Sequence, residues 1–272
     1  MTSPTQSQST TTPTAPIRVT VWGENFHENS DRDREMMARL YPDGMHGAIA
    51  AGLSELLGDR VEVRTATQDQ PEHGLSAEVL DNTDVLTWWG HATHGSVDDA
   101  VVDRVYSRVL GGMGLLPLHS AHFSKIFIKL MGTSCSLAWR NSADTELVWT
   151  VAPGHPITEG VPSPIVIDEQ EMYGEYFDIP QPDEQIFLST FTGGEVFRSG
   201  CTWRRGKGRI FYFSPGDQDY PVYHHPDIKR VLANAVQWAA PQRSIDFVAP
   251  AVVNEPAPRF RAQLAQDGEV SA

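Results

Sequence analysis

The sequence predicts an α/β fold whose central sheet is doubly wound and mostly parallel, in three layers. Short runs rich in β-branched residues alternate with segments of helical periodicity, and the connections between them are short. The apolar run 114–118 ends abruptly at His119 and is followed by apolar residues at helical spacing. In hydrolase-like α/β folds such a strand–turn–helix corner holds one exposed side chain above the carboxyl edge of the sheet. We therefore expect an interior strand at 114–118 and a functional side chain at its end.

The first half of the chain follows a β-α-β-α-β-α-β order. Alternating or apolar runs predict four strands, at 17–22, 61–67, 85–89 and 114–118. Apolar residues at helical spacing predict the intervening helices, at 45–57, 77–80 and 97–112. Gly58 closes the first helix and a pair of glycines closes the third, as is common after a last helical turn. This order is typical of a parallel sheet with helices on both faces.

The pattern is looser after the corner. Strand signals recur at 149–151, at 165–167, at 185–191 and twice between 195 and 213, where a turn is expected over 204–208. Three closely spaced carboxylates, Glu169, Glu171 and Glu175, follow the second of these signals and are expected on a loop at the rim of the sheet. The last helix is expected to begin with His225 as N-cap and Pro226 in its first turn.

Composition limits the possible functions. The formal net charge of −14 over 272 residues argues against a nucleic-acid or anionic-membrane partner, because phosphates would be repelled. No apolar run approaches the ~20 residues that a membrane-spanning helix needs. The segment 1–16 is expected to be a disordered tail rather than a secretory signal, 17–241 a single domain and 242–272 a second tail. Cys135 and Cys201 are the only cysteines; both are expected to be reduced, in a cytoplasmic protein.

Histidines gather where the predicted strands end. His27, His91 and His119 each follow a different strand, at the carboxyl edge where doubly wound sheets bind ligands. Neutral imidazoles near a carboxylate suit a divalent ion, so His27, His91 and His94 are candidate ligands, with zinc as the expected metal. No spacing motif supports this set, so a metal-free site stays an alternative. No nucleotide cofactor is expected.

Acid–base chemistry is the second expectation for this edge. His119 is the candidate proton carrier, because an imidazole transfers protons well near neutral pH. Glu171 or Asp217 would orient His119 or activate water. The alternatives are that His119 only satisfies the backbone of the corner and that Glu171 belongs to a solvated acidic loop. Contacts with a substrate are expected from one carboxylate and two aromatic side chains: Glu24, Trp89 and Tyr223.

Several motifs together resemble the ThuA-like, trehalose-utilisation family. They include WGENFHE (22–28), YPDGMHGAIA (41–50), WWGHATHGSV (88–97), LHSAHFSKIF (118–127) and GRIFYFSPGD (208–217), and the resemblance covers about 17–241. It implies a flavodoxin-like sheet of the class I glutamine amidotransferase type. It also implies a role in the breakdown of trehalose and related disaccharides, or of their keto derivatives.

The chain departs from that pattern at two positions. True amidotransferases of this fold place a cysteine at the corner, where this chain has His119, so glutamine hydrolysis by a thiolate is not expected. Family members often carry Gly-His after the last strand, where this chain has Gly216-Asp217; the role of that histidine would fall to Asp217, His224 or His225.

Together these features predict an enzyme of sugar catabolism. Its partner would be a small carbohydrate, and its reaction a hydrolysis, elimination or isomerisation by histidine and carboxylate groups, with or without a metal. The rival interpretation is a non-catalytic sugar-binding or regulatory module that lacks the nucleophilic cysteine. Whether the chain forms a homo-oligomer stays open.

Overall fold

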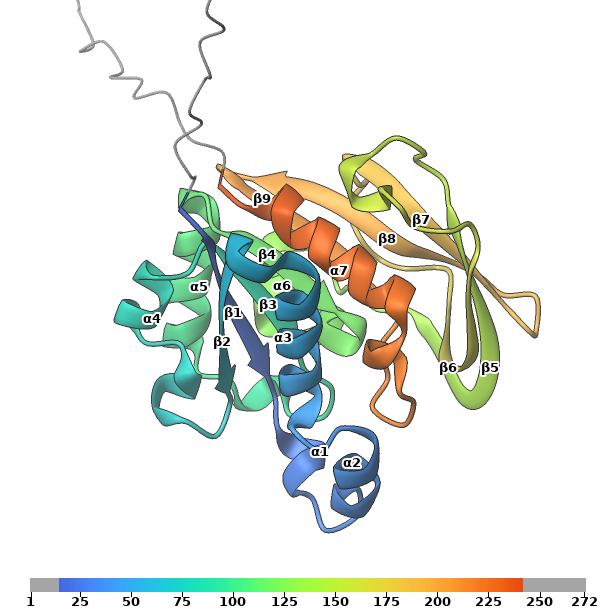
Figure 1. The fold of residues 1–272 in the computed structure, drawn as a ribbon, viewed down its shortest axis with the longest axis horizontal. Helices are drawn as coiled ribbons and strands as arrows, with labels where there is room; N and C mark the ends of the chain where they lie inside the picture. Colours follow the sequence, from blue (N-terminus) through green and yellow to red (C-terminus); the bar gives the residue numbers. More distant parts are fainter. Residues whose placement is uncertain (1–14, 242–272) are drawn as a thin grey trace, which may run out of the picture. The chain divides into compact units, whose positions relative to one another are not determined.

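The computed structural model describes residues 15–241 and builds them around one nine-stranded sheet (Figure 1). Its strand order is β2-β1-β3-β4-β9-β8-β7-β5-β6. The tails expected at 1–16 and 242–272 fall almost entirely outside the described residues. None of the helices between residues 15 and 241 is long and apolar enough to cross a membrane.

One half of the sheet is parallel and contains the strands predicted for the first half of the chain. Its members, in spatial order, are β2 (Val61–Thr67), β1 (Ile17–Gly23), β3 (Val85–Trp89), β4 (Gly114–Leu118) and β9 (Gly208–Phe213). All four pairings are parallel, and β4 is an interior strand as expected. With β9 as the fifth strand, this is the 2-1-3-4-5 order of flavodoxin-like sheets.

The other half of the sheet is antiparallel, so the prediction of a mostly parallel sheet is wrong. It contains β8 (Val196–Arg205), β7 (Glu184–Phe191), β5 (Ala138–Thr150) and β6 (Ile165–Gly174), and every pairing from β9 to β6 is antiparallel. The physical reason is the length of the connections: β8 and β9 are joined by the two-residue turn 206–207. A turn of this length can join only antiparallel strands. The sheet is therefore mixed.

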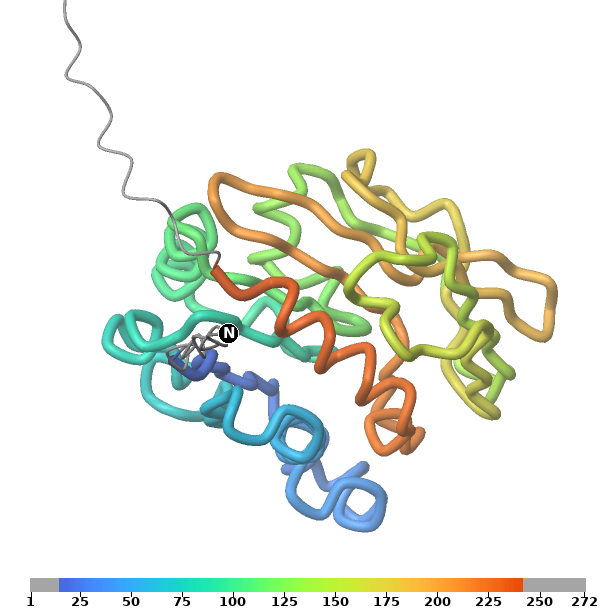
Figure 2. Tube along the Cα trace, turned by 45° about the horizontal axis from the view of Figure 1, so that its top comes forward, coloured from blue at the N-terminus to red at the C-terminus, as the bar shows by residue number. Residues whose placement is uncertain are grey.

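Helices cover both faces of the parallel half (Figures 1 and 2). On one face lie α3 (Gly44–Leu57) and α7 (Pro226–Ala239), whose Leu53 and Val231 pack in one core cluster with Val21 of β1. On the other face lie α4 (Ala77–Asp81), α5 (Asp99–Gly111) and α6 (Lys125–Met131). Val105 of α5 and Phe127 of α6 belong to a second cluster together with alternate residues of the same strands. Burial of both faces explains why the interior strands β3 and β4 are almost entirely apolar.

Local sequence signals account for the helix ends. The His225 side chain caps α7 by accepting a hydrogen bond from the Asp227 N–H, and Pro226 follows it at the start of the helix. The helix α3 ends at Gly58, which has the positive φ (53°) that a residue after a last turn often needs. These three predictions are confirmed.

Register brings four strand ends to one level. Gly23 of β1 pairs with Trp89 of β3, Trp89 with Leu118 of β4, and Leu118 with Phe213 of β9. The segments that leave these strands therefore start side by side at the carboxyl edge. The two short helices α1 (Phe26–Asn29) and α2 (Arg34–Leu40) follow β1 at the same edge. This edge holds the candidate site.

A buried carboxyl group in the antiparallel half should make stability depend on pH. Glu146 of β5 is 1 % exposed; burial raises its pKa to about 7, although Ser189 donates a hydrogen bond to it. The folded state then holds a proton that the unfolded chain releases above the ordinary glutamate pKa of 4.5, so stability falls as pH rises from about 4.5 to 7. Between these two pH values, the free energy of unfolding should fall on the order of 3 kcal/mol less in Glu146→Gln than in the wild type. Urea unfolding of both proteins at several pH values measures this difference. Equal pH profiles for the two proteins would contradict the prediction.

Candidate active site

The corner after β4 has a strained backbone. A short 3-10 turn, η4 (His119–Phe123), follows the strand directly, and Ser124 then caps α6 by accepting a hydrogen bond from the Phe127 N–H. His119 has φ 51°, which is uncommon for a residue with a side chain. The side chain of His119 is fully buried, so the expectation that it stands exposed above the edge is wrong. The corner instead directs the imidazole into the protein.

His119 lies between two buried carboxylates. Its Nδ1–H donates to the Ser214 carbonyl oxygen at 2.8 Å, which directs Nε2 the other way. Nε2 lies 3.1 Å from Glu171 Oε2, 3.3 Å from Asp217 Oδ2 and 3.2 Å from the Tyr173 hydroxyl. Glu171 comes from β6, Asp217 from the segment after β9 and His119 from the corner after β4, so three distant parts of the chain meet here.

The charges of this cluster depend on one another. Burial by itself lowers the pKa of His119, but the Asp217 and Glu171 carboxylates outweigh it and raise that pKa to about 10. Burial likewise raises the pKa of Asp217, yet His119 beside it holds this pKa below its usual value. Unless another cation takes its place, the proton on His119 stays bound at neutral pH. A positive charge is required between the two carboxylates.

A hydrogen-bond chain supports the neighbouring His91. Its Nδ1 lies 3.0 Å from His27 Nε2, and His27 Nδ1 lies 2.7 Å from Asp33 Oδ2. Because the Asp33 carboxylate accepts the His27 Nδ1–H, His27 Nε2 is left to accept the His91 Nδ1–H. Burial, followed by the charge of His119, lowers the pKa of His91 below its usual value. His91 is therefore neutral at pH 7, with the lone pair on Nε2.

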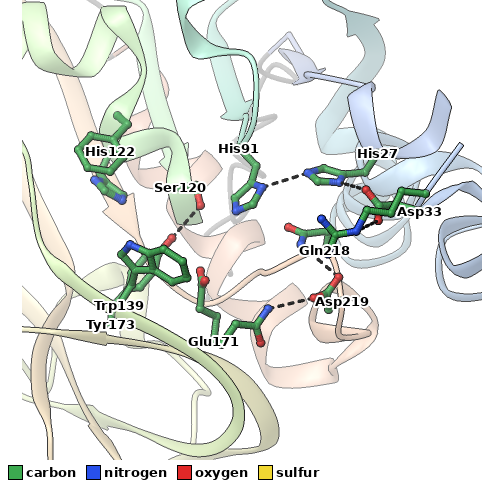
Figure 3. Close-up of a pocket in the computed structure, with 13 residues that line it drawn as sticks. His27, Asp33, His91, Ser120, His122, Trp139, Glu171, Tyr173, Gln218 and Asp219 are labelled. Atoms are coloured by element: carbon green, nitrogen blue, oxygen red, sulfur yellow. Dashed lines mark hydrogen bonds and ion pairs between the residues drawn. The ribbon is translucent and has the colours of Figure 1, made fainter. Parts of the chain in front are cut away.

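Several of these groups line a pocket of about 460 Å³, with Glu171 on its floor, at the bottom of the view (Figure 3). His91, Glu171, Tyr173 and Ser120 line it, whereas His119 and Asp217 lie behind the lining. The Ser120 and Tyr173 hydroxyls are hydrogen-bonded to each other at 2.7 Å. Burial raises the pKa of Tyr173 well above its usual value, so its hydroxyl stays protonated. The pocket thus offers a base, a carboxylate and two hydroxyl groups.

The structure brings together four of the residues singled out in the sequence. One nitrogen or oxygen atom from each of His91, His119, Glu171 and Asp217 lies within 4.8 Å of the others. Of the other two candidate metal ligands, His27 lies one hydrogen bond behind His91. His94 lies outside the cluster: burial lowers its pKa to about 4, and its Nε2 has no hydrogen-bond partner among the described residues.

Three residues expected to contact a sugar have other roles. The Glu24 carboxylate accepts the backbone N–H groups of His91, Ala92 and Thr93, at 2.5 to 3.1 Å. Trp89 and Tyr223 are each 1 % exposed, and the Trp89 indole N–H donates to the Gly216 carbonyl oxygen at 2.9 Å. Neither ring presents a face to a ligand, so the expectation of stacking on them is wrong.

Glu24 fixes the loop that carries His91. Its carboxylate serves three amide donors in a buried position, so removing it would leave these donors without partners. We expect Glu24→Ala to lower the free energy of unfolding by about 3 kcal/mol. Urea denaturation measures this loss. A loss no larger than that of Glu62→Ala, at an exposed position of β2, would contradict the role.

Two of the three acidic residues after 165–167 lie on a strand rather than on a loop. β6 continues to Gly174 and includes Glu169 and Glu171. Glu171 is buried in the cluster, whereas Glu169 is exposed. Glu175 follows the strand and pairs with Arg198 at 2.8 Å. The prediction that Glu169 and Glu171 lie on a rim loop is wrong. Polar residues on the partly exposed strand obscure the alternation of apolar and polar residues by which a strand is recognised.

Sequence reasoning missed two further groups at this pocket. Asp33 completes the chain behind His91, and Trp139 of β5 lines the pocket with 63 % of its surface exposed. No local signal identifies Asp33 in its acidic and basic surroundings. Trp139 does carry a signal, because it is followed by Arg140, Asn141 and Ser142, which offer it no apolar cover.

A match to a protein-family model shows the family to which the chain belongs. The model for ThuA, described as trehalose utilisation, matches residues 18–239. The chain belongs to the ThuA family. This membership confirms the resemblance and supports a role connected with sugars. Among curated proteins, none matches this ThuA-family chain at a significant level.

Solved structures agree at the level of the fold. A ThuA-like protein from Parabacteroides merdae has a TM-score of 0.61 at 13 % identity, covering 90 % of this chain and 94 % of its own. A ThuA-like protein from Bacteroides uniformis has a TM-score of 0.57 at 15 % identity, covering 85 % and 95 %. A cytoplasmic protein from Salmonella typhimurium has a TM-score of 0.54 at 13 % identity, covering 83 % and 100 %.

The corner of this chain carries no thiol. Both cysteines are buried, and burial raises the pKa of Cys135 to about 11 and that of Cys201 to about 12. A thiolate is therefore absent from both at neutral pH. The polar side chains of the cluster and of the hydroxyl pair beside it are imidazole, carboxylate and hydroxyl groups.

Proposed function

We propose that this chain is an enzyme of sugar breakdown that acts on a trehalose-like disaccharide or its keto derivative by histidine–carboxylate acid–base chemistry. Membership of the ThuA family supports the substrate class. One observation carries the reaction type. His91 points an unprotonated nitrogen towards the pocket, with the His27–Asp33 chain behind it to stabilise the positive charge that His91 would gain.

His91 takes the proton in this proposal. The sequence favoured His119 for this role, but His119 lies behind the pocket lining and is held by the Ser214 carbonyl oxygen and two carboxylates. His91 is less deeply buried and faces the pocket. A base of this kind can remove a proton from a hydroxyl group or from the carbon beside a keto group.

The pocket also offers partners for the negative charge that such a step creates. The Tyr173 and Ser120 hydroxyls lie beside the cluster and can donate hydrogen bonds to a carbonyl oxygen that becomes an enolate. Glu171 is the carboxylate at the floor, within reach of a substrate hydroxyl or of water. The reaction class that fits is proton abstraction beside a carbonyl, leading to isomerisation or to elimination of the second sugar.

We propose that a sugar ring of the substrate packs on the exposed indole of Trp139. Its exposed indole borders the pocket next to Tyr173, its cross-strand partner, and a pyranose has an apolar face that packs on such a ring. We expect Trp139→Ala to raise KM about three- to tenfold while kcat changes little. The control is Trp149→Ala on the same strand, 39 % exposed and outside the pocket, which should leave KM unchanged. Equal kinetics for the two variants would contradict the stacking role.

The direct test is a substrate screen. The full-length protein is incubated with trehalose, with other disaccharides and with their 3-keto derivatives, and product is followed by chromatography. Turnover of at least one keto disaccharide supports the proposal. Saturable binding without product would instead favour the rival function, a sugar-binding or regulatory module.

A further inference from the structure

The cluster around His119 places two buried carboxyl groups against one imidazole. Glu171 and Asp217 are both almost fully buried, and one oxygen of each lies within 3.3 Å of His119 Nε2. Within residues 15–241, no lysine or arginine forms an ion pair with either carboxylate. Two buried carboxyl groups therefore face one imidazole as their nearest basic group, and buried carboxylates are costly unless they are paired or bind a metal.

One carboxylate oxygen also lacks a partner. Asp217 is fully buried; its Oδ1 accepts the Asp219 N–H at 2.9 Å. Its Oδ2 points towards His119 Nε2 but has no hydrogen-bond partner among the described residues. A single proton on Nε2 cannot serve both carboxylates, so this oxygen is available to another ligand.

The spacing of the donor atoms fits one metal ion. Two ligands held at about 2.0–2.2 Å from a common ion lie roughly 2.9–3.6 Å apart in octahedral or tetrahedral geometry. His119 Nε2 lies 3.1 and 3.3 Å from the two carboxylate oxygens. Hydrogen bonds between an imidazolium and a carboxylate are usually shorter, at about 2.7–2.9 Å. The two distances therefore suit atoms that bind the same metal ion better than atoms that hydrogen-bond directly to each other.

The surroundings of His119 match those of a metal ligand. A ligating histidine almost always donates its other ring N–H to a carbonyl or carboxylate, which fixes the tautomer. His119 does so through Nδ1 to the Ser214 carbonyl oxygen, and its strained backbone holds the ring in place. Nε2 is thereby aimed at the two carboxylates, where it would bind the ion once it has lost its proton.

We propose that His119, Glu171 and Asp217 bind one divalent metal ion, of the Zn²⁺ or Mn²⁺ class, through His119 Nε2 and the two facing carboxylate oxygens. One imidazole and two carboxylates suit ions of this class. His91, the fourth group within 4.8 Å, faces the pocket and keeps its role in proton transfer. This site differs from the set expected from the sequence, since His27 and His94 do not reach it. The role of the ion rests on the proposed function: it would polarise a substrate carbonyl from the floor of the pocket.

The test measures binding of the metal alone, without substrate. Untagged full-length protein is stripped with a chelator and titrated with Zn²⁺ and with Mn²⁺ by calorimetry, and metal content is measured after gel filtration. We expect one ion per chain, with affinity lowered at least tenfold in Asp217→Asn and in Glu171→Gln. Glu169→Gln is the matched control, because Glu169 lies exposed on the same strand, and it should bind like the wild type.

The outcomes separate this inference from the proposed function. Wild-type protein that binds neither ion, or a folded Asp217→Asn variant that binds as the wild type does, would overturn the metal site. Should Asp217→Asn fail to fold, Glu171→Gln gives the same comparison. Stoichiometric binding that both variants weaken, found together with no turnover of any sugar, would support the site and overturn only the proposed reaction. Turnover that persists in chelator-stripped protein would overturn the role of the ion.

Discussion

Replacing His91 with glutamine is expected to lower kcat for the keto disaccharide by a factor of about 100 to 10,000, because general-base catalysis contributes that much. Glutamine keeps a polar side chain but cannot accept a proton at neutral pH. The metal content should stay the same, since His91 is not assigned as a ligand. Steady-state kinetics and metal analysis of the same preparation measure both effects.

Two further variants test whether the loss of kcat is specific to His91 and the hydrogen-bond chain behind it. Asp33→Asn should lower kcat less, about tenfold, because Asp33 acts on His91 only through His27. His224→Gln should leave kcat unchanged, since His224 is exposed and hydrogen-bonds the Leu40 carbonyl oxygen away from the pocket. A folded His91→Gln variant with wild-type kcat would remove His91 from the mechanism.

Gly216→Ala is expected to lower the free energy of unfolding by about 3 kcal/mol or more and to abolish activity. Gly216 has φ 140°, and a Cβ atom there would overlap the phenol of the buried Tyr223. Relief requires the backbone or the ring to move, and Asp217 is the next residue. The change should therefore displace a carboxylate of the cluster as well as strain the core. Urea denaturation and the kinetic assay measure the two effects.

Gly194→Ala separates the cost of the backbone conformation from the cost of overlap. Gly194 also has a positive φ, of 90°, but nothing lies within 4 Å of the position of its Cβ. Its replacement should cost only about 1 kcal/mol and leave activity intact. Equal losses in the two variants would show that overlap with Tyr223 contributes nothing.

Sequence patterns predicted the parallel half of the fold well. Strands such as β3 and β4 are buried at every position and almost entirely apolar, and glycines stand near their ends, so their limits are readable. The antiparallel half was less readable. β5 and β6 have one partly exposed face, and bulges between Arg140 and Glu146 interrupt the alternation. The turn before β9 was expected from the sequence, but hydrophobic patterning does not report the direction of β5, β6 and β7, which are joined by longer connections.

The site was predictable where topology alone brings residues together. His91 and His119 follow neighbouring parallel strands, and Asp217 follows the next one, so the rule for strand ends places all three at one edge. The rule does not give the direction of a side chain. Whether His119 points out or in depends on its φ of 51°, and the burial of Trp89 depends on packing across the sheet. These features need the folded coordinates.

Solvent-deuterium exchange tests the central claim most directly. The wild-type chain is incubated with a 3-keto disaccharide in D₂O, and the carbon beside the keto group is followed by NMR. If His91 removes that proton, deuterium appears there faster than without protein, and His91→Gln slows the exchange by at least about 100-fold. A keto disaccharide that binds saturably, yet shows neither enzyme-dependent exchange nor product, would contradict the account and leave a sugar-binding module.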